Sequence, residues 1–504
     1  MSSQITLESI LALAPELSLL ILAIAILFLD KVFKRGNQRG LGLTTAWGTL
    51  IILLLTIGIW VFLDQPNDVP VTYWGGMIRQ DLVTLVFRII FLIALLITAL
   101  ISLDFKGVQR GEYYALLLTA TIGFSLMAAS ADLIMLYVAL ETASICLYIL
   151  AAFKKDEYRS DEAGMKYFIY GAFASAVMLF GMSYLYGLTQ ETNIYVIAEE
   201  VTQSALANPA LRGTVLIAAA MVIVGFGFKV SVVPYHFWAP DVYEGAPTPV
   251  TGLVSTASKA AGFAVFLRVF TAGVFGPADS SNAWWAMLVA ICIVTMTLGN
   301  LLAIRQSNIK RLLAYSSIAQ AGYAMMGLVT ALTTFGLNPD SIDGAGATMF
   351  FLVYYAITNI AAFGIVILVS NISGSDETQD LAGLSRRSPY LALAMLFALL
   401  SLGGIPPTAG FFGKFFIFRA AVEAGLWWLA LIGIINAFIA LYYYLSVAKV
   451  IYLYRSEDEE VAIPVSRAAG LAIGLTIFGI IYLGILANSA FELTRQAATA
   501  FFAG

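Results

Sequence analysis

The sequence predicts an all-α polytopic membrane protein of about fourteen transmembrane helices, and three observations carry this prediction. Of its 504 residues, 60% are hydrophobic and only 12% are charged, whereas soluble globular chains are nearer half apolar and a quarter charged. Apolar runs of about 20 residues, the length that crosses a bilayer core as a helix, recur along the whole chain. The loops between these runs alternate between basic and acidic, as loops on opposite sides of a membrane do.

The predicted spans follow from the apolar runs in chain order. They cover residues 9–32, 43–63, 82–103, 113–130, 131–152, 163–188, 213–239, 248–273, 283–304, 308–332, 345–371, 389–422, 427–453 and 467–490. We expect one membrane domain over residues 1–504, made of N-terminal helices (1–112), a first repeat (113–273), a second repeat (283–453), and a last helix with its tail (467–504).

Loop charge predicts the orientation of these spans. With the N-terminus outside, the inner loops hold six basic clusters: Lys31/Lys34/Arg35/Arg39, Lys106/Arg110, Lys154/Lys155/Arg159, Arg305/Lys310/Arg311, Arg386/Arg387 and Lys449/Arg455/Arg467. The outer loops are acidic or nearly uncharged, with Asp64, Asp68, Asp279 and Asp340 among their charges. One inner loop departs from the pattern, because it carries Asp241 and Glu244. No basic segment precedes the first apolar run, so we expect a retained first helix instead of a cleaved signal peptide, and both termini outside.

Two of the predicted spans are interrupted. The seventh contains Pro234 after two glycines, and the twelfth contains the segment SLGGIPPTAGFFGK. Proline removes a backbone donor and clashes with the preceding turn, so both helices should be broken. Matching broken helices in two halves of a chain are typical of transporters built from repeats. A shift of 184 residues aligns Met165 with Met349 and Tyr170 with Tyr354, which predicts two inverted five-helix repeats, helices four to eight and nine to thirteen.

Ionisable residues inside the predicted spans are the candidate functional residues, because each costs about 2.5–3.5 kcal/mol at a helix centre. They are Glu141, Lys166, Lys229, Lys259, Lys414 and His236, which follows the break in the seventh span. We expect Glu141 to be the only deep acid, with Lys166 or Lys229 as its partner. Burial and a nearby carboxylate act in opposite directions on how firmly a lysine holds its proton. Movement of Glu141 relative to Lys229 would therefore switch proton binding.

The residue types favour proton relay over fixed ion pairing. All the deep cations are expected to be lysine or histidine and none arginine, which stays charged throughout. Arg88, in the third span, is expected to reach the outer headgroups. Other interpretations stay open: Lys166 could extend to the inner surface, Lys259 and Lys414 could bind carbonyls at the helix breaks, and His236 could be a hydrogen-bonded core residue.

Cofactor and nucleic-acid sites are not expected in this chain. The single histidine cannot provide a bis-histidine haem, and Cys146 and Cys292 lack any ligand spacing and are too few for an iron–sulfur cluster. Basic residues are few and scattered along short loops, so no nucleic-acid footprint is predicted.

Four segments carry a resemblance to a known family. GFGFKVSVVPYHFWAPDVYEGAPTPV, SKAAGFAVFLRV, RQSNIKRLLAYSSIAQAGY and LSLGGIPPTAGFFGKF resemble the antiporter-like membrane subunits of respiratory complex I, the proton-pumping NADH:quinone oxidoreductase. The resemblance extends over all the predicted spans. Pro15 with Glu16, a lysine at position 414, and the absence of a long lateral extension after the last predicted helix favour one type of subunit within that family.

The resemblance implies a role for each candidate. Glu141 matches the family's fifth-helix glutamate, Lys229 its partner, Lys259 the relay lysine and Lys414 the lysine of the broken twelfth helix. His236 and Lys166 match intervening positions of the polar axis.

The implied function is proton translocation without cofactors in this chain, driven by quinone reduction elsewhere. FMN, iron–sulfur clusters and quinone would belong to other subunits, and the partners would be neighbouring antiporter-like and small membrane-arm subunits and lipids. The location would be a bacterial plasma membrane or an equivalent energy-coupling membrane. The residues alone predict only a proton-handling transporter, so a cation/proton antiporter subunit without redox coupling and a membrane scaffold stay as alternatives.

Overall fold

Helices account for almost all of the computed structural model, which describes residues 6–32, 39–62, 70–207, 211–272, 274–275, 283–334, 342–456 and 461–502. The α-helices are α1 (Leu7–Ala12), α2 (Ala14–Val32), α3 (Arg39–Phe62), α4 (Leu82–Ser102), α5 (Gly111–Ala129), α6 (Leu133–Ala151), α7 (Tyr158–Thr189), α8 (Ile194–Ala207), α9 (Leu211–Val230), α10 (Trp238–Gly245), α11 (Thr248–Leu253), α12 (Lys259–Thr271), α13 (Ala283–Ala303), α14 (Ile309–Thr334), α15 (Ile342–Ser373), α16 (Leu384–Arg387), α17 (Pro389–Gly403), α18 (Ala409–Glu423), α19 (Trp427–Leu453), α20 (Arg467–Ile485) and α21 (Ala487–Phe502). A π-helical turn, η1 (Val254–Ser258), and a 3₁₀ turn, η3 (Thr378–Leu381), complete the helical elements.

Twelve helices of the described chain are long and apolar enough to cross a membrane. Two further predicted spans correspond to α2, which carries charged residues near both ends, and to the pair of shorter helices α17 and α18. The prediction of an all-helical, multi-pass membrane protein is confirmed, while the count of fourteen and the repeat symmetry stay predictions. The loop charges at Lys34, Arg35, Asp64, Asp68, Asp279 and Asp340 lie outside the described residues.

Local sequence explains where several helices begin and how closely they pack. Asp81 and Asp132 cap α4 and α6, because their carboxylates accept hydrogen bonds from backbone amides of the first turn. Gly123 of α5 lies directly against α6, where a Cβ would come within 2.7 Å of the backbone nitrogen of Ala143. Small residues of this kind allow close packing between membrane helices. A short antiparallel hairpin that the sequence analysis did not predict, β1 (Val71–Tyr73) with β2 (Ile78–Gln80), precedes α4.

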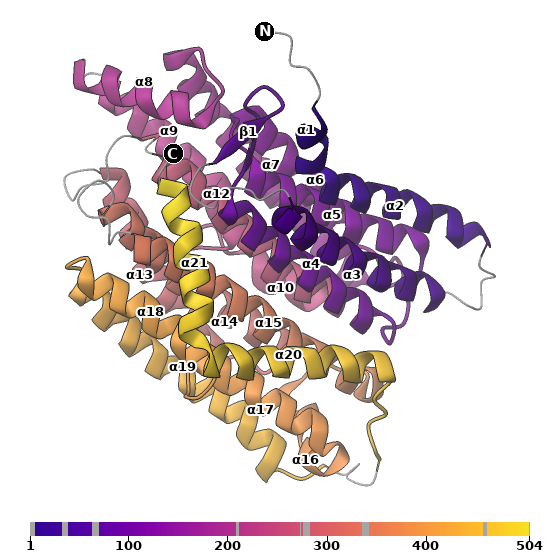
Figure 1. Ribbon diagram of the computed structural model, residues 1–504. Coiled ribbons are helices and arrows are strands. Elements are labelled where there is room, and N and C mark those ends of the chain that lie inside the picture. The colour runs from indigo at the N-terminus through magenta and orange to yellow at the C-terminus, as the bar shows by residue number, and fades with distance from the viewer. Residues whose placement is uncertain are drawn as a thin grey trace.

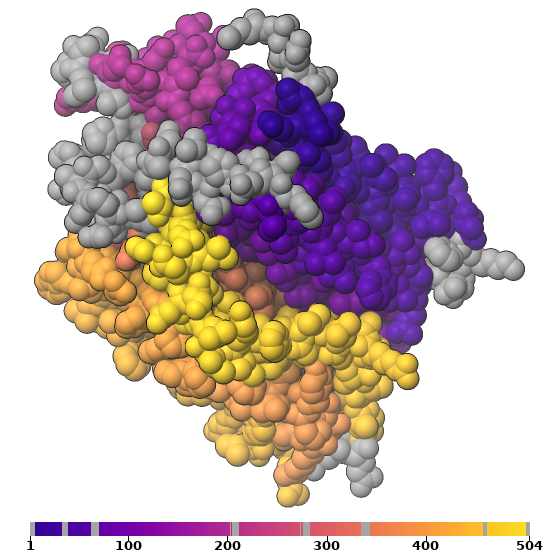
Figure 2. Space-filling view, viewed as in Figure 1, coloured from indigo at the N-terminus to yellow at the C-terminus, as the bar shows by residue number. Residues whose placement is uncertain are grey.

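The helices form two groups with a shared centre. In Figure 1 the N-terminal helices α2–α5 lie on one side, α16–α20 lie on the other, and α10, α14 and α15 lie between them. The last helix, α21, packs against both α15 and α4. The yellow C-terminal helices therefore bridge the purple N-terminal part and the orange part in the space-filling view (Figure 2).

Three helical interruptions lie at the centre of the molecule. α9 ends at Val230 and α10 begins only at Trp238, so the seventh predicted span is broken near Pro234. α17 ends at Gly403 and α18 begins at Ala409, which breaks the twelfth. The third interruption was not predicted: the π-helical turn η1 separates α11 from α12 directly before Lys259. Such π-helical turns occur frequently at functional sites.

Candidate functional site

Lys229 lies in the last turn of α9, immediately before the break in that helix. Its side chain is buried, and its Nζ atom donates a hydrogen bond to Ser144 Oγ of α6 at 3.0 Å. Gly262 of α12 packs against the lysine stem, since a Cβ at this glycine would lie 3.3 Å from Lys229 Cγ. Lys229 is thus positioned by α6 and α12.

Glu141 lies one helical turn before Ser144 on α6. Its Oε1 atom is buried and accepts no hydrogen bond from any described residue. Glu141 is close enough to Lys229 to interact electrostatically. The structure therefore places the two predicted partners near each other without a direct ion pair, and Ser144 is the group that contacts the lysine.

Lys259 is the first residue of α12 after the π-helical turn, and it is buried. Its Nζ atom donates a hydrogen bond to the backbone carbonyl of Ser317 on α14 at 2.7 Å. The Ser317 hydroxyl in turn accepts a hydrogen bond from Tyr355 at 2.7 Å. Asn359 of α15 joins Tyr355 (3.1 Å) to Ser255 of the π-helical turn (2.8 Å). Lys259 thus belongs to a polar cluster that α12, α14 and α15 share.

Lys414 lies in the second turn of α18, after the break in the twelfth predicted span. Its buried Nζ atom donates hydrogen bonds to the carbonyls of Leu402 at 2.9 Å and Gly403 at 3.1 Å. The last carbonyls of a helix have no partner within the helix, so the end of α17 provides acceptors for this cation. This contact fits both a relay role and the static carbonyl-binding role considered above.

Helix α14 connects the surroundings of Lys259 with those of Lys414. Gln320 donates hydrogen bonds to the Leu402 carbonyl at 3.0 Å, the same carbonyl that Lys414 binds, and to Tyr444 at 3.2 Å. Tyr444 also bonds to Ser316, which precedes the Lys259 acceptor Ser317. Polar groups on less than two turns of α14 therefore contact the partners of both lysines. These residues were not among the candidates predicted from the sequence, although the polar stretch SSIAQ inside an apolar span was a visible signal.

Several buried polar atoms beside these lysines have no partner among the described residues. They are Glu141 Oε1, Ser231 Oγ, His236 Nδ1, Ser258 Oγ, Gln320 Oε1 and Asn359 Oδ1. Buried polar groups of this kind normally bind ordered water. His236 is buried in the break after α9, and no described side chain hydrogen-bonds to its Nδ1 atom, so its place in a relay stays a prediction.

Lys166 does not lie in the buried axis, which corrects the sequence-based prediction. Its side chain is 37% exposed, and its Nζ atom is 2.7 Å from Glu162 and 2.6 Å from Asp241. Arg311 binds Asp241 and Glu244, each at 2.9 Å. Burial alone would raise the pKa of Asp241, but hydrogen bonds from Lys166 and Arg311 outweigh burial and lower this pKa. This cluster explains how the loop that departs from the predicted charge pattern can carry two acids: cations from neighbouring helices neutralise them.

Comparison with known proteins identifies the family. The family described as "NADH:quinone oxidoreductase/Mrp antiporter, TM" matches residues 130–440. NADH-quinone oxidoreductase subunit N of Moorella thermoacetica is 40% identical over 485 residues, which cover 95% of this chain and 96% of that protein. Subunit N of Desulforamulus reducens is 41% identical over 495 residues, with 96% and 97% covered. This chain belongs to the subunit N family of NADH-quinone oxidoreductases.

Solved structures support the same fold for this member of the subunit N family. A chain of respiratory complex I from Thermus thermophilus with bound aureothin is 31% identical, with a TM-score of 0.76 over 95% of this chain and 98% of that chain. A chain of the Mrp complex from Dietzia sp. DQ12-45-1b is 21% identical, with a TM-score of 0.84 over 99% and 98%. The second likeness concerns the fold alone.

Two buried arginines contradict the prediction that all deep cations are lysine or histidine. Arg88 does not reach the headgroups, because its guanidinium pairs with Glu16 at 2.8 Å and also binds Gln80 at 2.9 Å. Arg268 is fully buried and binds both carboxylate oxygens of Asp81, at 2.8 and 3.0 Å.

The acid that pairs with Arg88 corrects a second prediction. Glu16 is also buried in the described structure, so Glu141 is not the only deep acid. Both arginines have acceptors for their guanidinium groups, which is why they are tolerated at this depth.

Proposed function

We propose that this chain is a proton-translocating membrane-arm subunit of an NADH:quinone oxidoreductase. Protons would move along a buried axis of Glu141, Lys229, Lys259 and Lys414, coupled to quinone reduction elsewhere in the complex. FMN, iron–sulfur clusters and quinone would be held by other subunits, and neighbouring antiporter-like and small membrane subunits would be the partners. The family supports this assignment, because the relatives carry the name of that enzyme.

One observation carries the proposal: Lys259 and Lys414 are both buried and are both bound to partners on or beside α14. A lysine bonded to one or two neutral carbonyls can lose its proton without leaving a carboxylate unpaired. Arginine could not serve in this way, since it stays charged. The two arginines buried inside the membrane helices are instead paired with acids, Arg88 with Glu16 and Arg268 with Asp81. Lys259 and Lys414 thus differ from these two arginines in their partners in the way that relay and fixed pairing require.

The first half of the axis would work as a switch. Lys229 contacts Ser144, and Glu141 is near enough to influence the lysine charge without being bonded to it. A small movement of α6 relative to the broken end of α9 would bring the carboxylate to the ammonium or separate the two. His236 would act beside the break, and Lys166 would act at the surface through Asp241, not as a buried relay group.

The arrangement of the chain in the membrane is part of the same proposal. Two inverted repeats, residues 113–273 and 283–453, would each contribute one broken helix and one buried relay lysine beside it. The basic loops would lie on the inner side of the bacterial plasma membrane and both termini on the outer side.

A second function, a cation/proton antiporter subunit without redox coupling, is favoured by one observation, the fold shared with the Mrp complex. The discriminating experiment is affinity purification of the tagged chain from mild-detergent membranes, with assays for flavin and iron–sulfur centres. Co-purification of redox subunits is the expected result. Recovery of small membrane proteins alone, together with sodium-dependent exchange without a redox substrate, would support the antiporter and refute the proposal.

A further inference from the structure

On one side of Lys229, the space between α9 and α12 is filled by aromatic rings. Phe226 lies one turn before the lysine on α9, and its ring packs against that of Phe266 on α12, with 5.2 Å between the centroids. Phe266 is one turn beyond Gly262, which contacts the lysine stem. Phe124 of α5 adds a third ring, 5.9 Å from the Lys229 ammonium. All three rings are fully buried, so an apolar layer lies between the lysine and the end of α12.

Beyond the aromatic layer, an ion cluster joins the ends of three helices. Arg268 of α12 binds both carboxylate oxygens of Asp81, which caps α4, and also donates to the carbonyl of Ala128 near the end of α5. Asp81 accepts further hydrogen bonds from Thr84 at 2.8 Å and from Arg79 at 3.0 Å. No buried side-chain nitrogen or oxygen of this cluster lacks a partner in the part of the chain that the structure describes.

Backbone hydrogen bonds between loops adjoin the same helix ends. The amide of Ala131, just after α5, donates to the carbonyl of Met77 in the hairpin at 2.9 Å. The Ala131 carbonyl accepts from Ile194 at 2.9 Å, and Leu133 donates to Thr192 at 2.8 Å. The hairpin and the α5–α6 and α7–α8 connections thus form one layer whose backbone groups bind one another instead of water. The orientation proposed above places this layer on the outer side of the membrane.

Hydration distinguishes the Arg268 cluster from the lysine axis. Polar atoms along the axis, such as Glu141 Oε1 and Ser258 Oγ, lack partners among the described residues and are sites for ordered water. The Arg268 cluster offers no such site, and its arginine cannot take part in proton exchange because it stays charged. A fixed arginine raises an electrostatic barrier to protons, and an apolar constriction excludes water. This end of the molecule combines both barriers.

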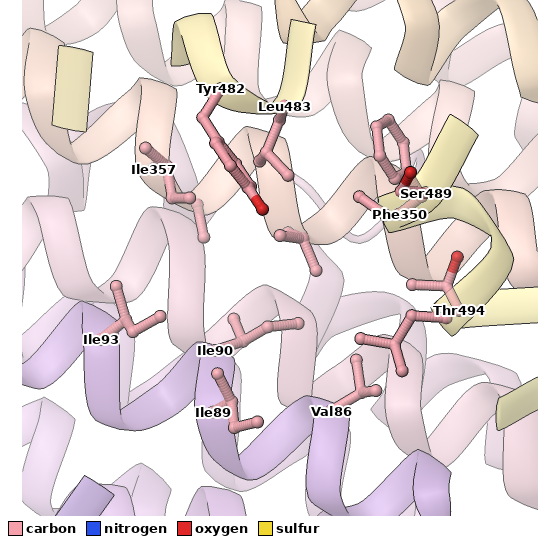
Figure 3. A pocket seen from close by; sticks show the side chains of 14 residues that line it. Val86, Ile89, Ile90, Ile93, Phe350, Ile357, Tyr482, Leu483, Ser489 and Thr494 are labelled. Atoms are coloured by element: carbon pink, nitrogen blue, oxygen red, sulfur yellow. The ribbon is translucent and has the colours of Figure 1, made fainter. Parts of the chain in front are cut away.

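An apolar groove beside α4 does not bypass these barriers. It lies between α4, α15, α20 and α21, and its few hydroxyl groups belong to α20 and α21 (Figure 3). The wall that α4 provides is entirely aliphatic: Val86, Ile89, Ile90 and Ile93. Water is not stable in apolar surroundings of this kind, so the groove gives a proton no hydrated route past the start of α4.

We propose that the layer of Phe226 and Phe266 and the cluster of Arg268 and Asp81 form a seal that prevents proton exchange between Lys229 and the outer side through this end of the molecule. The inference rests on the proposed function, since a seal matters only if Lys229 exchanges protons. A proton released by the Glu141–Lys229 switch would then have to move along the axis towards Lys259, and outer protons could not return directly to the switch.

Passive proton conductance tests the seal without any redox substrate. The complex is reconstituted into liposomes, a potassium gradient with valinomycin sets the membrane potential, and an internal pH dye reports proton flux. Arg268→Ser admits water beside Asp81 and should raise the flux at least fivefold above the wild type. Arg268→Lys keeps a cation there and should stay within twofold of the wild type. The control, Arg88→Met with Glu16→Leu, removes another buried ion pair and should not increase the flux.

The route of the leak decides between a seal and general loosening of the fold. Adding Lys229→Met to Arg268→Ser should remove the extra flux, whereas a leak that persists in this double variant would refute the seal. An Arg268→Ser complex that oxidises NADH with an artificial acceptor but stays as tight as the wild type would also refute it. Phe226→Ala, in the aromatic layer, provides the same test if Arg268→Ser does not assemble.

Failure of the seal is distinguishable from failure of the proposed function. Tight variants of a complex whose wild type translocates protons during NADH oxidation would refute the seal alone. A wild-type complex without NADH-driven translocation would refute the proposed function and the seal with it.

Discussion

Replacing Lys259 by arginine tests whether this residue must release its proton or only supply a positive charge. The lysine is buried and its Nζ atom has one hydrogen bond, to the Ser317 carbonyl at 2.7 Å. The ordinary pKa of arginine is about two to three units above that of lysine. Lys259→Arg should therefore keep a fixed cation at this site while making its neutral form about 100- to 1,000-fold rarer. If Lys259 is a relay group, proton translocation should fall by at least tenfold.

Lys259→Met is the matched control for stability. It removes one charge-assisted hydrogen bond, worth about 1.5–3 kcal/mol, and also removes the cost of burying an ammonium, which is several kcal/mol. The protein should therefore assemble, and translocation should again be lost. Both variants are assayed in inside-out vesicles by quenching of a pH-sensitive dye during NADH oxidation, with an artificial electron acceptor as the measure of intact assembly. A Lys259→Arg complex that retains more than half of its translocation would refute a relay role.

Three further predictions concern an ion pair, a packing contact and a surface carboxylate. Arg88→Met should destabilise the protein by about 3–5 kcal/mol, because it leaves Glu16 buried without its cation. In thermal melts, the double variant Arg88→Met with Glu16→Leu should regain most of the lost stability. Gly262→Ala should cost about 1–3 kcal/mol by overpacking, because the added Cβ would lie 2.6 Å from Val230 Cγ1 and 3.3 Å from Lys229 Cγ. Vesicle assays should show proton translocation falling more than electron transfer; equal losses would contradict a positioning role. The pKa of Asp241 is lowered in the folded state, so its charged form stabilises the fold, by about 1 kcal/mol or less at this partly exposed site. This stabilisation is present above pH ~4 and is lost as the pH falls through the folded pKa. The wild-type advantage over Asp241→Asn in thermal melts should therefore vanish on acidification, and a difference that persists at low pH would contradict this assignment.

The membrane fold was predictable because it depends on composition and spacing. Apolar runs of bilayer length identify the helices, and the two proline-containing interruptions near Pro234 and Pro406 were visible as sequence breaks. The π-helical turn before Lys259 was not, since residues 254–258 contain no proline or glycine that would signal it. The hairpin before α4 was also missed, because its strands have three residues each, too short for a clear alternation.

The site was predictable only as a set of residue types. Buried lysines are costly and therefore conspicuous, so Lys229, Lys259 and Lys414 were identified. Their partners are mainly neutral groups and backbone carbonyls, as the Ser317 carbonyl is for Lys259, and these have no sequence signature. Arg88 was misplaced for the same reason: its partner Glu16 lies 72 residues away in the chain, and a single sequence does not show which distant segments meet.

The most direct test of the proposed axis is the number of protons translocated per electron pair in vesicles that carry Lys229→Met. Lys154→Ala serves as the control, since Lys154 is outside the axis and pairs with Glu157 at the surface. We expect Lys229→Met to translocate far fewer protons while electron transfer to an artificial acceptor is preserved, and Lys154→Ala to match the wild type. Full translocation by an assembled Lys229→Met complex would contradict the axis and would leave this chain with a structural role.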